Sequence, residues 1–374
     1  MKDHKKTYIN EGSAKQQGMI RSMILLLLLL CQLSVFAAFQ VSRVLIAGRE
    51  NPWGINTSTP TFSWQLHSDG YDVSQHAYRI EVALDAAFRK NTLQWDSEWQ
   101  QTAQSLHRPY RGKPLTAGTT YFVRITVKDN HGHTAVSKTQ QMHIGLLDPA
   151  DWADAAWITK DVLPDSLIQP LPLSSSKLRI DKSYDLPVFR KSVHLTKRLK
   201  SSVAYISGLG HYELLLNGKT VDDAVLQPGW TKYDNEAYYV VYDITKQWRQ
   251  GKNTFAVLLG NGFYYIPPIK GRFQKHKVAF GLPKLKMKVV NTFTDGTEEI
   301  VVTDRTWKAH RSPITFSSIY GGEDYDAGVL PTNWALPSYD DTHWQAALLT
   351  DGPPLRAQEI DPVRIMQNFA PKKV

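Results

Sequence analysis

Two short stretches of the sequence place aromatic side chains beside polar groups that can form fixed hydrogen bonds. They span residues 228–234 and 261–264 and supply the candidates Trp230, Tyr233, Asp234, Asn261 and Tyr264. A sugar ring stacks its apolar face on an aromatic side chain and needs hydrogen-bonding groups for its hydroxyls. Gly260 and Gly262 allow the second stretch to turn sharply. These residue types therefore fit a carbohydrate-binding site built on loops.

A structural role is the alternative for the same residues. Aromatic side chains in β-sandwiches commonly belong to the core, so Trp230 and Phe263 can be core residues. Asp234 and Asn261 can likewise serve as hydrogen-bond partners of the loop backbone. For Trp230 the core is the favoured of the two interpretations.

The densest group of acidic side chains in a predicted loop is formed by Glu323, Asp324 and Asp326. Such a group can bind sugar hydroxyls, coordinate calcium through carboxylate oxygens, or project toward a catalytic cleft. A solvated turn is the most frequent outcome for such a group.

His131 and His133 flank a glycine, but a lone His-x-His pair lacks the further ligands that zinc takes. We therefore predict no metal site and no cofactor.

Alternating apolar residues predict that β-strands position these loops. Residues 78–84 and 121–127 alternate in a first segment, and residues 284–294 and 299–303 do so in a second. Asn-Gly at 217–218 and Asp-Gly at 295–296 are the residue pairs of tight hairpin turns. Apart from one helix-like turn at 245–249, apolar residues do not recur at helical spacing. The predicted fold class is all-β, with two sandwiches in succession.

The first 38 residues are expected to be a secretory signal peptide. Six consecutive leucines follow Arg21, and Val35-Phe36-Ala37 offers small residues for cleavage. The apolar run is short for a membrane span, so we expect an exported protein, periplasmic, at the cell surface or extracellular, with no integral span. Cys31, the only cysteine, lies in this leader, so the mature chain is expected to contain no disulfide.

Composition also bounds the domains and partners. We expect an immunoglobulin/fibronectin-like sandwich at 39–147, a linker and loop at 148–188, a second sandwich at 189–345, and the start of a truncated further β-domain at 346–374. The net charge of the 374 residues is +9, and five basic and two acidic side chains precede Phe39. The remaining +6 is spread thinly, which argues against a nucleic-acid partner.

A series of short motifs carries a family resemblance. In the first segment these motifs are Asn51-Pro-Trp-Gly-Ile, Phe62-Ser-Trp64, Trp95-Asp-Ser97 and Tyr121-Phe-Val-Arg124. In the second they include Phe189-Arg-Lys191, Ile206-Ser-Gly-Leu-Gly210, Pro228-Gly-Trp230, Leu259-Gly-Asn-Gly262 and Gly322-Glu-Asp-Tyr-Asp-Ala327. Together they resemble the N-terminal half of bacterial α-L-rhamnosidases of glycoside hydrolase family 78. The resemblance implies an immunoglobulin-like domain followed by a galactose-binding-like jelly-roll sandwich.

The resemblance also implies where hydrolysis takes place. In the family, two carboxylates of a helical toroid act as general acid and base, roughly 6.5 to 9.5 Å apart. The sequence shows no such helices, so no catalytic residue is carried over and the chain is expected to be inactive alone. Rhamnose-binding modules of family 67 hold the sugar through calcium, with an acidic pair just before the position of Tyr212. Gly210 and His211 stand there instead, so calcium is not expected.

Three functions remain open. The favoured one is the non-catalytic N-terminal portion of an exported α-L-rhamnosidase-like protein, with a rhamnose-containing polysaccharide or glycoside, and a separate catalytic chain, as candidate partners. The second is a free-standing carbohydrate-binding module for terminal α-L-rhamnose. The third is a structural or interaction sandwich, which an exposed apolar face would favour. Residues 363–369 alternate like a strand that lacks its sheet, which favours the first.

Overall fold

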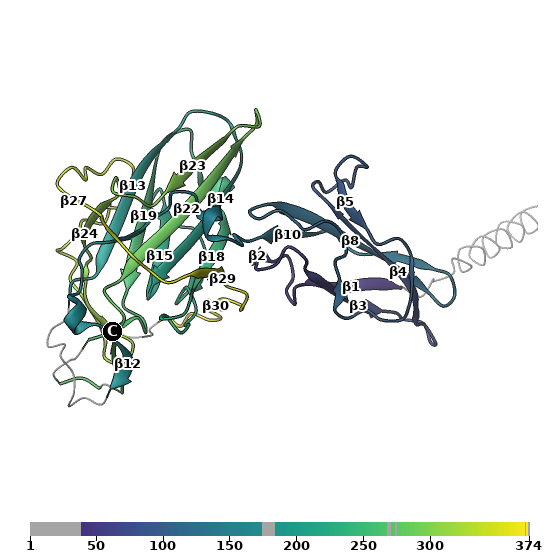
Figure 1. Ribbon diagram of the computed structural model, residues 1–374, viewed down its shortest axis with the longest axis horizontal. Helices are drawn as coiled ribbons and strands as arrows, with labels where there is room; N and C mark the ends of the chain where they lie inside the picture. The colour runs from purple at the N-terminus through teal and green to yellow at the C-terminus, as the bar shows by residue number, and fades with distance from the viewer. Residues whose placement is uncertain (1–38, 174–183, 268–270, 274, 371, 373–374) are drawn as a thin grey trace, which may run out of the picture.

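The computed structural model describes residues 39–173, 184–267, 271–273, 275–370 and 372. These residues form two β-domains that lie end to end in an elongated molecule (Figure 1). Their regular elements are strands and short 3-10 turns, so the predicted all-β fold class is confirmed. In these ranges no helix has the length and apolar character needed to cross a membrane. The predicted signal peptide lies outside the described residues.

The first domain is a sandwich of two sheets. One has the order β1-β3-β7 and contains β1 (Gln40–Ile46), β3 (Thr61–His67) and β7 (Arg108–Pro109). The other has the order β2-β10-β8-β4-β5 and contains β2 (Trp53–Ile55), β10 (Gln140–Ile144), β8 (Thr120–Asp129), β4 (Gln75–Ala83) and β5 (Leu93–Asp96), with β6 (Gln100–Gln101) beside β4 and β9 (Thr134–Val136) beside β8. The stretches predicted as strands at 78–84 and 121–127 fall largely in β4 and β8. Alternate side chains of β8 fill the core between the sheets.

The second domain is a larger sandwich. One sheet has the order β28-β11-β22-β14-β18-β29 and contains β28 (Leu348–Thr350), β11 (Trp157–Thr159), β22 (Lys284–Phe293), β14 (Leu199–Leu209), β18 (Ala237–Asp243) and β29 (Leu355–Ala357), with β23 (Glu298–Val302) beside β22. The other has the order β16-β15-β19-β13-β24-β27 and contains β16 (Lys219–Thr220), β15 (His211–Leu216), β19 (Gly251–Gly260), β13 (Pro187–Leu195), β24 (Lys308–Arg311) and β27 (Gln345–Ala346). On β22 the residues Leu285, Met287 and Val289 are fully buried, because every second side chain points into the core.

Short elements complete the second domain. They are the sheet β12-β21-β20, made of β12 (Gln169–Leu173), β21 (Lys277–Ala279) and β20 (Tyr265–Ile266); the pair β17 (Ala224–Val225) and β30 (Val363–Arg364); and the hairpin β25 (Ile314–Ser318) and β26 (Gly322–Tyr325). The 3-10 turns are η1 (Pro149–Trp152), η2 (Asp165–Leu167) and η4 (Thr245–Gln247). The last of these is the helix-like turn expected at 245–249.

The second sandwich takes in strands that the sequence placed elsewhere. β11 comes from the segment expected to be a linker, and β28, β29 and β30 come from the segment expected to begin a further domain. β11 pairs with both β22 and β28, and β29 runs parallel to β18. The physical reason is that backbone groups at a sheet edge need partners, and these short segments supply them. Segments this short carry too little alternation to be recognised as strands.

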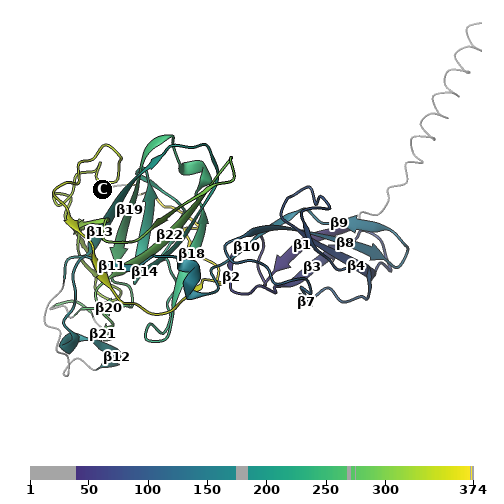
Figure 2. The same cartoon turned by 45° about the horizontal axis from the view of Figure 1, so that its top comes forward.

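The two domains are joined by buried hydrogen bonds, where β10 and β2 approach β18 and its neighbours (Figure 2). Nε2 of His143 lies 2.8 Å from the Tyr205 hydroxyl oxygen. The Tyr239 hydroxyl lies 2.6 Å from the backbone nitrogen of Leu146 and 3.0 Å from its carbonyl oxygen. The Asn56 side chain makes two hydrogen bonds of 2.7 Å with the backbone of Ala357. The junction is therefore bonded at several points.

Candidate functional site

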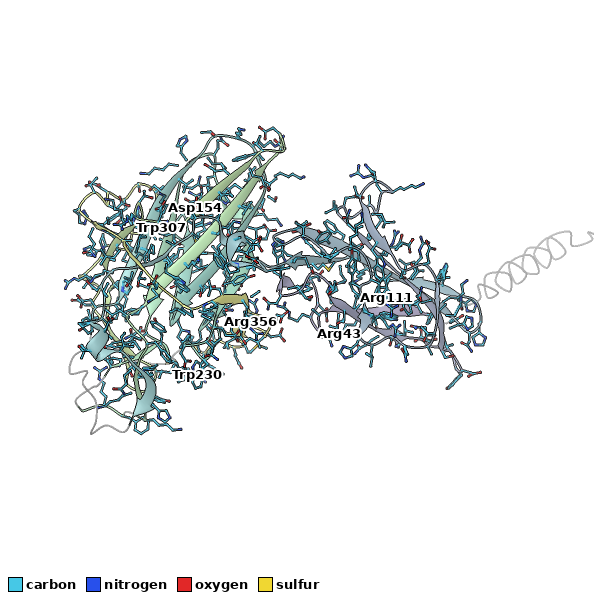
Figure 3. All side chains as sticks on the ribbon, in the orientation of Figure 1. Arg43, Arg111, Asp154, Trp230, Trp307 and Arg356 are labelled. Atoms are coloured by element: carbon cyan, nitrogen blue, oxygen red, sulfur yellow. The ribbon has the colours of Figure 1, made fainter. Side chains whose placement is uncertain are left out.

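A pocket of about 360 Å³ opens at one end of the second domain. Its apolar lining residues are Pro170, Trp230, Phe263, Ile266, Val278, Phe280 and Tyr320, and its polar ones are Thr231, Lys232, Asp234 and His276. Figure 3 shows Trp230 at the end of the domain where Figure 1 labels β12. The loop between β17 and β18, the turn after β19 and the tip of the β25–β26 hairpin meet there. The pocket therefore combines an aromatic wall with a few polar groups.

Trp230 forms the exposed part of the aromatic wall. Its ring is stacked on that of Phe263, with 4.4 Å between ring centroids and 14° between the planes. Trp230 is 65% exposed, so the interpretation of this residue as a core aromatic is wrong. The loop is tied down just before it, because the backbone N–H of Gly229 donates to Oε1 of Gln358 at 2.8 Å. Trp230 is thus held outside the core on an anchored loop.

Tyr233 and Tyr264 lie beneath the pocket. Each is 3% exposed, and their rings meet edge to face with centroids 5.3 Å apart. The Tyr264 hydroxyl is 3.3 Å from the carbonyl oxygen of Phe280, and burial raises the pKa of both tyrosines. Both rings belong to a small buried cluster that includes Trp157 and Leu209. The structure does not place Tyr233 and Tyr264 in the pocket lining, so their role is to support the pocket from below.

Asn261 holds the turn that carries Phe263. Its side chain is 1% exposed and donates from Nδ2 to the carbonyl oxygen of Ser317 at 2.8 Å. The main-chain carbonyl oxygen of Asn261 accepts from the backbone N–H groups of Tyr264 and Tyr265 at 3.1 and 3.2 Å. This is the structural role that the sequence left as an alternative. Asn261 therefore links the turn to the β25–β26 hairpin and does not face a ligand.

Asp234 and the group of acidic residues lie at different places. Asp234 lines the pocket, and its carboxylate is 3.5 Å from the ammonium of Lys232. Asp324 accepts from the guanidinium of Arg272 through both carboxylate oxygens, at 2.7 Å each. Asp326 accepts from the backbone N–H of Gly328 at 2.9 Å, and Glu323 is exposed on β26. The structure thus brings Asp234 to Trp230 but leaves Glu323, Asp324 and Asp326 on the neighbouring hairpin, outside the pocket lining.

Metal ligands do not gather around the site in the part of the chain that the structure describes. No group of three or more His, Cys, Asp or Glu side chains is positioned to hold an ion there. Gly210 and His211 stand where the resemblance to rhamnose-binding modules of family 67 would place an acidic pair, and burial lowers the pKa of the His211 imidazole. A neutral imidazole lacks the oxygen ligands that calcium takes. The residues present therefore do not fit a calcium site of that kind.

Several lining residues could not be found from the sequence pattern. Pro170, Ile266, His276 and Phe280 come from the small sheet β12-β21-β20 and its flanks, far from Trp230 in the chain. No periodicity marks them, because they line the pocket only once the loops fold together. Phe263 is the lining residue that the sequence could indicate, because it follows Gly262 in a predicted turn. In the structure Gly262 has a φ of +49°, which glycine adopts readily.

Comparison with known proteins gives matches over both domains. Two protein-family models match the sequence. The model of the Rha78A-like N-terminal immunoglobulin domain matches residues 41–148, and the model of the α-L-rhamnosidase N-terminal domain matches residues 197–367. An α-L-rhamnosidase of Formosa agariphila is 34% identical over 352 residues, which make up 89% of this chain and 36% of that protein. One of Alteromonas sp. is 30% identical over 87% of this chain and 35% of that protein.

Solved structures agree with the sequence matches. The α-L-rhamnosidase from Dictyoglumus thermophilum superimposes with a TM-score of 0.76 and 31% identity, covering 89% of this chain and 37% of that one. The enzyme from Aspergillus terreus gives a TM-score of 0.74 at 28% identity, covering 87% and 36%. The chain therefore spans about a third of the length of the proteins it matches.

Proposed function

Because this chain contains the two N-terminal β-domains of the α-L-rhamnosidase family, we propose that it recognises rhamnose-containing glycans through the pocket beside Trp230. The observation that carries the proposal is an exposed indole, stacked on Phe263 at the mouth of a pocket of about 360 Å³. An exposed tryptophan costs free energy in water, and a sugar ring stacked on its free face would remove that cost.

The polar groups of the pocket suit a neutral sugar. Lys232 and His276 can donate hydrogen bonds, and Asp234 can accept them. The Thr231 hydroxyl donates to the carbonyl oxygen of Glu236 at 2.7 Å and can accept a further hydrogen bond. The close approach of Lys232 to Asp234 leaves no large net charge at the rim. The apolar residues Ile266, Val278 and Phe280 offer a dry surface for the carbon face of a deoxy sugar. The pocket therefore matches an amphipathic ring better than an ion.

The arrangement supports binding and not hydrolysis at this pocket. Inverting hydrolysis needs two carboxyl groups on opposite sides of the scissile bond. Among the described residues that line the pocket, Asp234 supplies the one carboxylate. Hydrolysis by the family is accordingly not assigned to these residues.

The test is titration calorimetry of the purified chain with L-rhamnose and methyl α-L-rhamnoside. We expect saturable binding that Trp230→Ala weakens roughly tenfold. Such a loss is about 1.4 kcal/mol of binding free energy, near the upper end of what one aromatic stacking contact contributes. Tyr71→Ala is the matched control, because Tyr71 is 99% exposed on the first domain and its loss should change nothing. Equal affinity in the Trp230→Ala protein would contradict the proposal.

A second candidate function is docking to a separate polypeptide, such as a catalytic chain. It is favoured by the exposed apolar side chains Val363, Ile365, Met366 and Phe369, which are 55–93% exposed.

Export through the Sec pathway is likewise part of the proposal, supported by the leucine run before residue 39. Detection of the cleaved chain outside the cytoplasm would test the export proposal.

A further inference from the structure

The aromatic wall of the pocket continues beyond it. Tyr320, at the tip of the β25–β26 hairpin, meets the edge of Phe263 with 6.3 Å between ring centroids and 82° between the planes. On its other side, Tyr320 meets Phe273 at 6.3 Å and 85°. Phe273 is 72% exposed and lies outside the pocket lining. Trp230, Phe263, Tyr320 and Phe273 therefore form one row of rings with an exposed aromatic at each end.

The far end of this row is fixed in place. Arg272, next to Phe273 in the chain, donates to both carboxylate oxygens of Asp324 at 2.7 Å. Its guanidinium also lies 4.8 Å from the ring centroid of Phe316 on β25. Both hydrogen bonds come from Nη2, and together with the Phe316 contact they tie the Arg272 side chain to the hairpin beside Phe273. The exposed ring is thus presented on an anchored backbone.

A polar pair is bonded next to the exposed ring, because Arg272 precedes Phe273 in the chain and is hydrogen-bonded to Asp324. The guanidinium can donate hydrogen bonds to sugar hydroxyls, and the carboxylate can accept them. An aromatic face with an oppositely charged pair close by is the combination that the pocket itself shows with Trp230 and the Lys232–Asp234 pair. The repetition of this combination along one surface points to a polymer of similar units.

We infer that the surface formed by Phe273, Tyr320 and the Arg272–Asp324 pair is a second saccharide subsite, continuous with the pocket, so that the site takes at least two linked sugar units. This inference rests on the proposed function, because the pocket is its first subsite. The ligand class is therefore an oligosaccharide with an accessible internal or penultimate unit.

The experiment compares methyl α-L-rhamnoside with a rhamnose disaccharide and a trisaccharide by calorimetry on the full chain. The disaccharide should bind roughly two- to tenfold more tightly than the monosaccharide, as one further aromatic contact allows. Phe273→Ala should abolish this gain and leave monosaccharide affinity unchanged. Asp324→Ala should reduce the gain as well, because it releases Arg272. Both changes concern exposed side chains, so the fold is expected to survive, and Tyr71→Ala again serves as the control.

The outcomes separate the two proposals. Equal affinity for all three ligands, or a gain that Phe273→Ala retains, overturns the second subsite while leaving the pocket intact. Monosaccharide binding that Trp230→Ala leaves unchanged overturns the proposed function. If none of the three ligands binds, both are overturned, and the row of rings is then to be tested as a protein-docking surface.

Discussion

Acid should weaken the junction between the domains through His143. This side chain is 1% exposed, and its ring is stacked on Trp53 with centroids 4.9 Å apart. Its Nδ1 lies 2.8 Å from the Thr120 hydroxyl, and its Nε2 lies 2.8 Å from the hydroxyl of Tyr205 in the other domain. Burial lowers the pKa of His143 from 6.5 to about 4, against a small opposing effect of Asp243. The imidazole is therefore neutral in the folded protein at neutral pH.

The size and direction of the effect follow from this pKa. Between about pH 6.5 and about pH 4, His143 binds a proton in the unfolded chain but not in the folded one. Its contribution is fully present above the higher of these values and is lost as the pH falls toward the lower. The lowering of the pKa corresponds to about 3 kcal/mol when the loss is complete, of which roughly 2.5 kcal/mol is lost by about pH 4.5.

The measurement is urea unfolding at a series of pH values, for the natural chain and for His143→Gln. The glutamine removes the titrating group and can keep one hydrogen bond to Tyr205. We expect the variant to be less stable at neutral pH but to lose about 3 kcal/mol less on acidification. His76→Gln is the control, because it makes the same substitution at an exposed position on β4.

Other titrating groups do not obscure this window. Hydrogen bonds from Arg79 and Thr297 respectively lower the pKa of Asp96 and Asp295 below 3.8, so these carboxylates lose their contributions at lower pH. His211 also has a lowered pKa, but it is present in both proteins and cancels in the comparison. If the natural chain and His143→Gln show the same pH dependence between about pH 7 and pH 4, the reasoning from burial is refuted.

Three further changes test the packing. Arg190→Met removes a fully buried guanidinium bonded to a carboxylate and to backbone carbonyls, and should lower the free energy of unfolding by about 3 kcal/mol in urea titrations. Gly352→Ala should cost about 1–3 kcal/mol, because the new Cβ would clash with Nε1 of Trp157; an unchanged melting temperature would contradict this. Gln358→Ala should weaken rhamnoside binding in calorimetry with a stability loss of only about 1 kcal/mol, because it frees the N–H of Gly229.

The long strands were predictable from sequence, because a half-buried strand repeats its pattern over many residues. β22 alternates apolar and lysine side chains, and Asp-Gly at 295–296 turns it into β23, with Thr292 opposite Glu298. The short strands β11 and β28 were not predictable, since three residues carry no period. Their assignment depends on which sheet edge lies nearby, and the sequence does not state that.

The candidate site was predictable only in its residue types. Trp230, Tyr233 and Tyr264 all belong to aromatic loop segments, but only the packed structure separates the exposed ring from the two buried ones. Burial of an aromatic side chain is decided by residues distant in the chain, such as Phe280. The polar candidates divided in the same way, because Asn261 turned inward to Ser317 while Asp234 stayed at the rim.

One segment connects the first domain to the loop of the site. Asn56 holds Ala357, and Nη1 of Arg49 donates to the carbonyl oxygen of Gln358 at 3.2 Å. The side chain of Gln358 in turn holds Gly229, the residue before Trp230. A change that separates the domains, such as protonation of His143, would therefore release the anchor of the Trp230 loop as well. Rhamnoside affinity should then fall in the same pH range as the stability of the junction, whereas a pocket independent of the first domain would keep its affinity until the second domain itself unfolds.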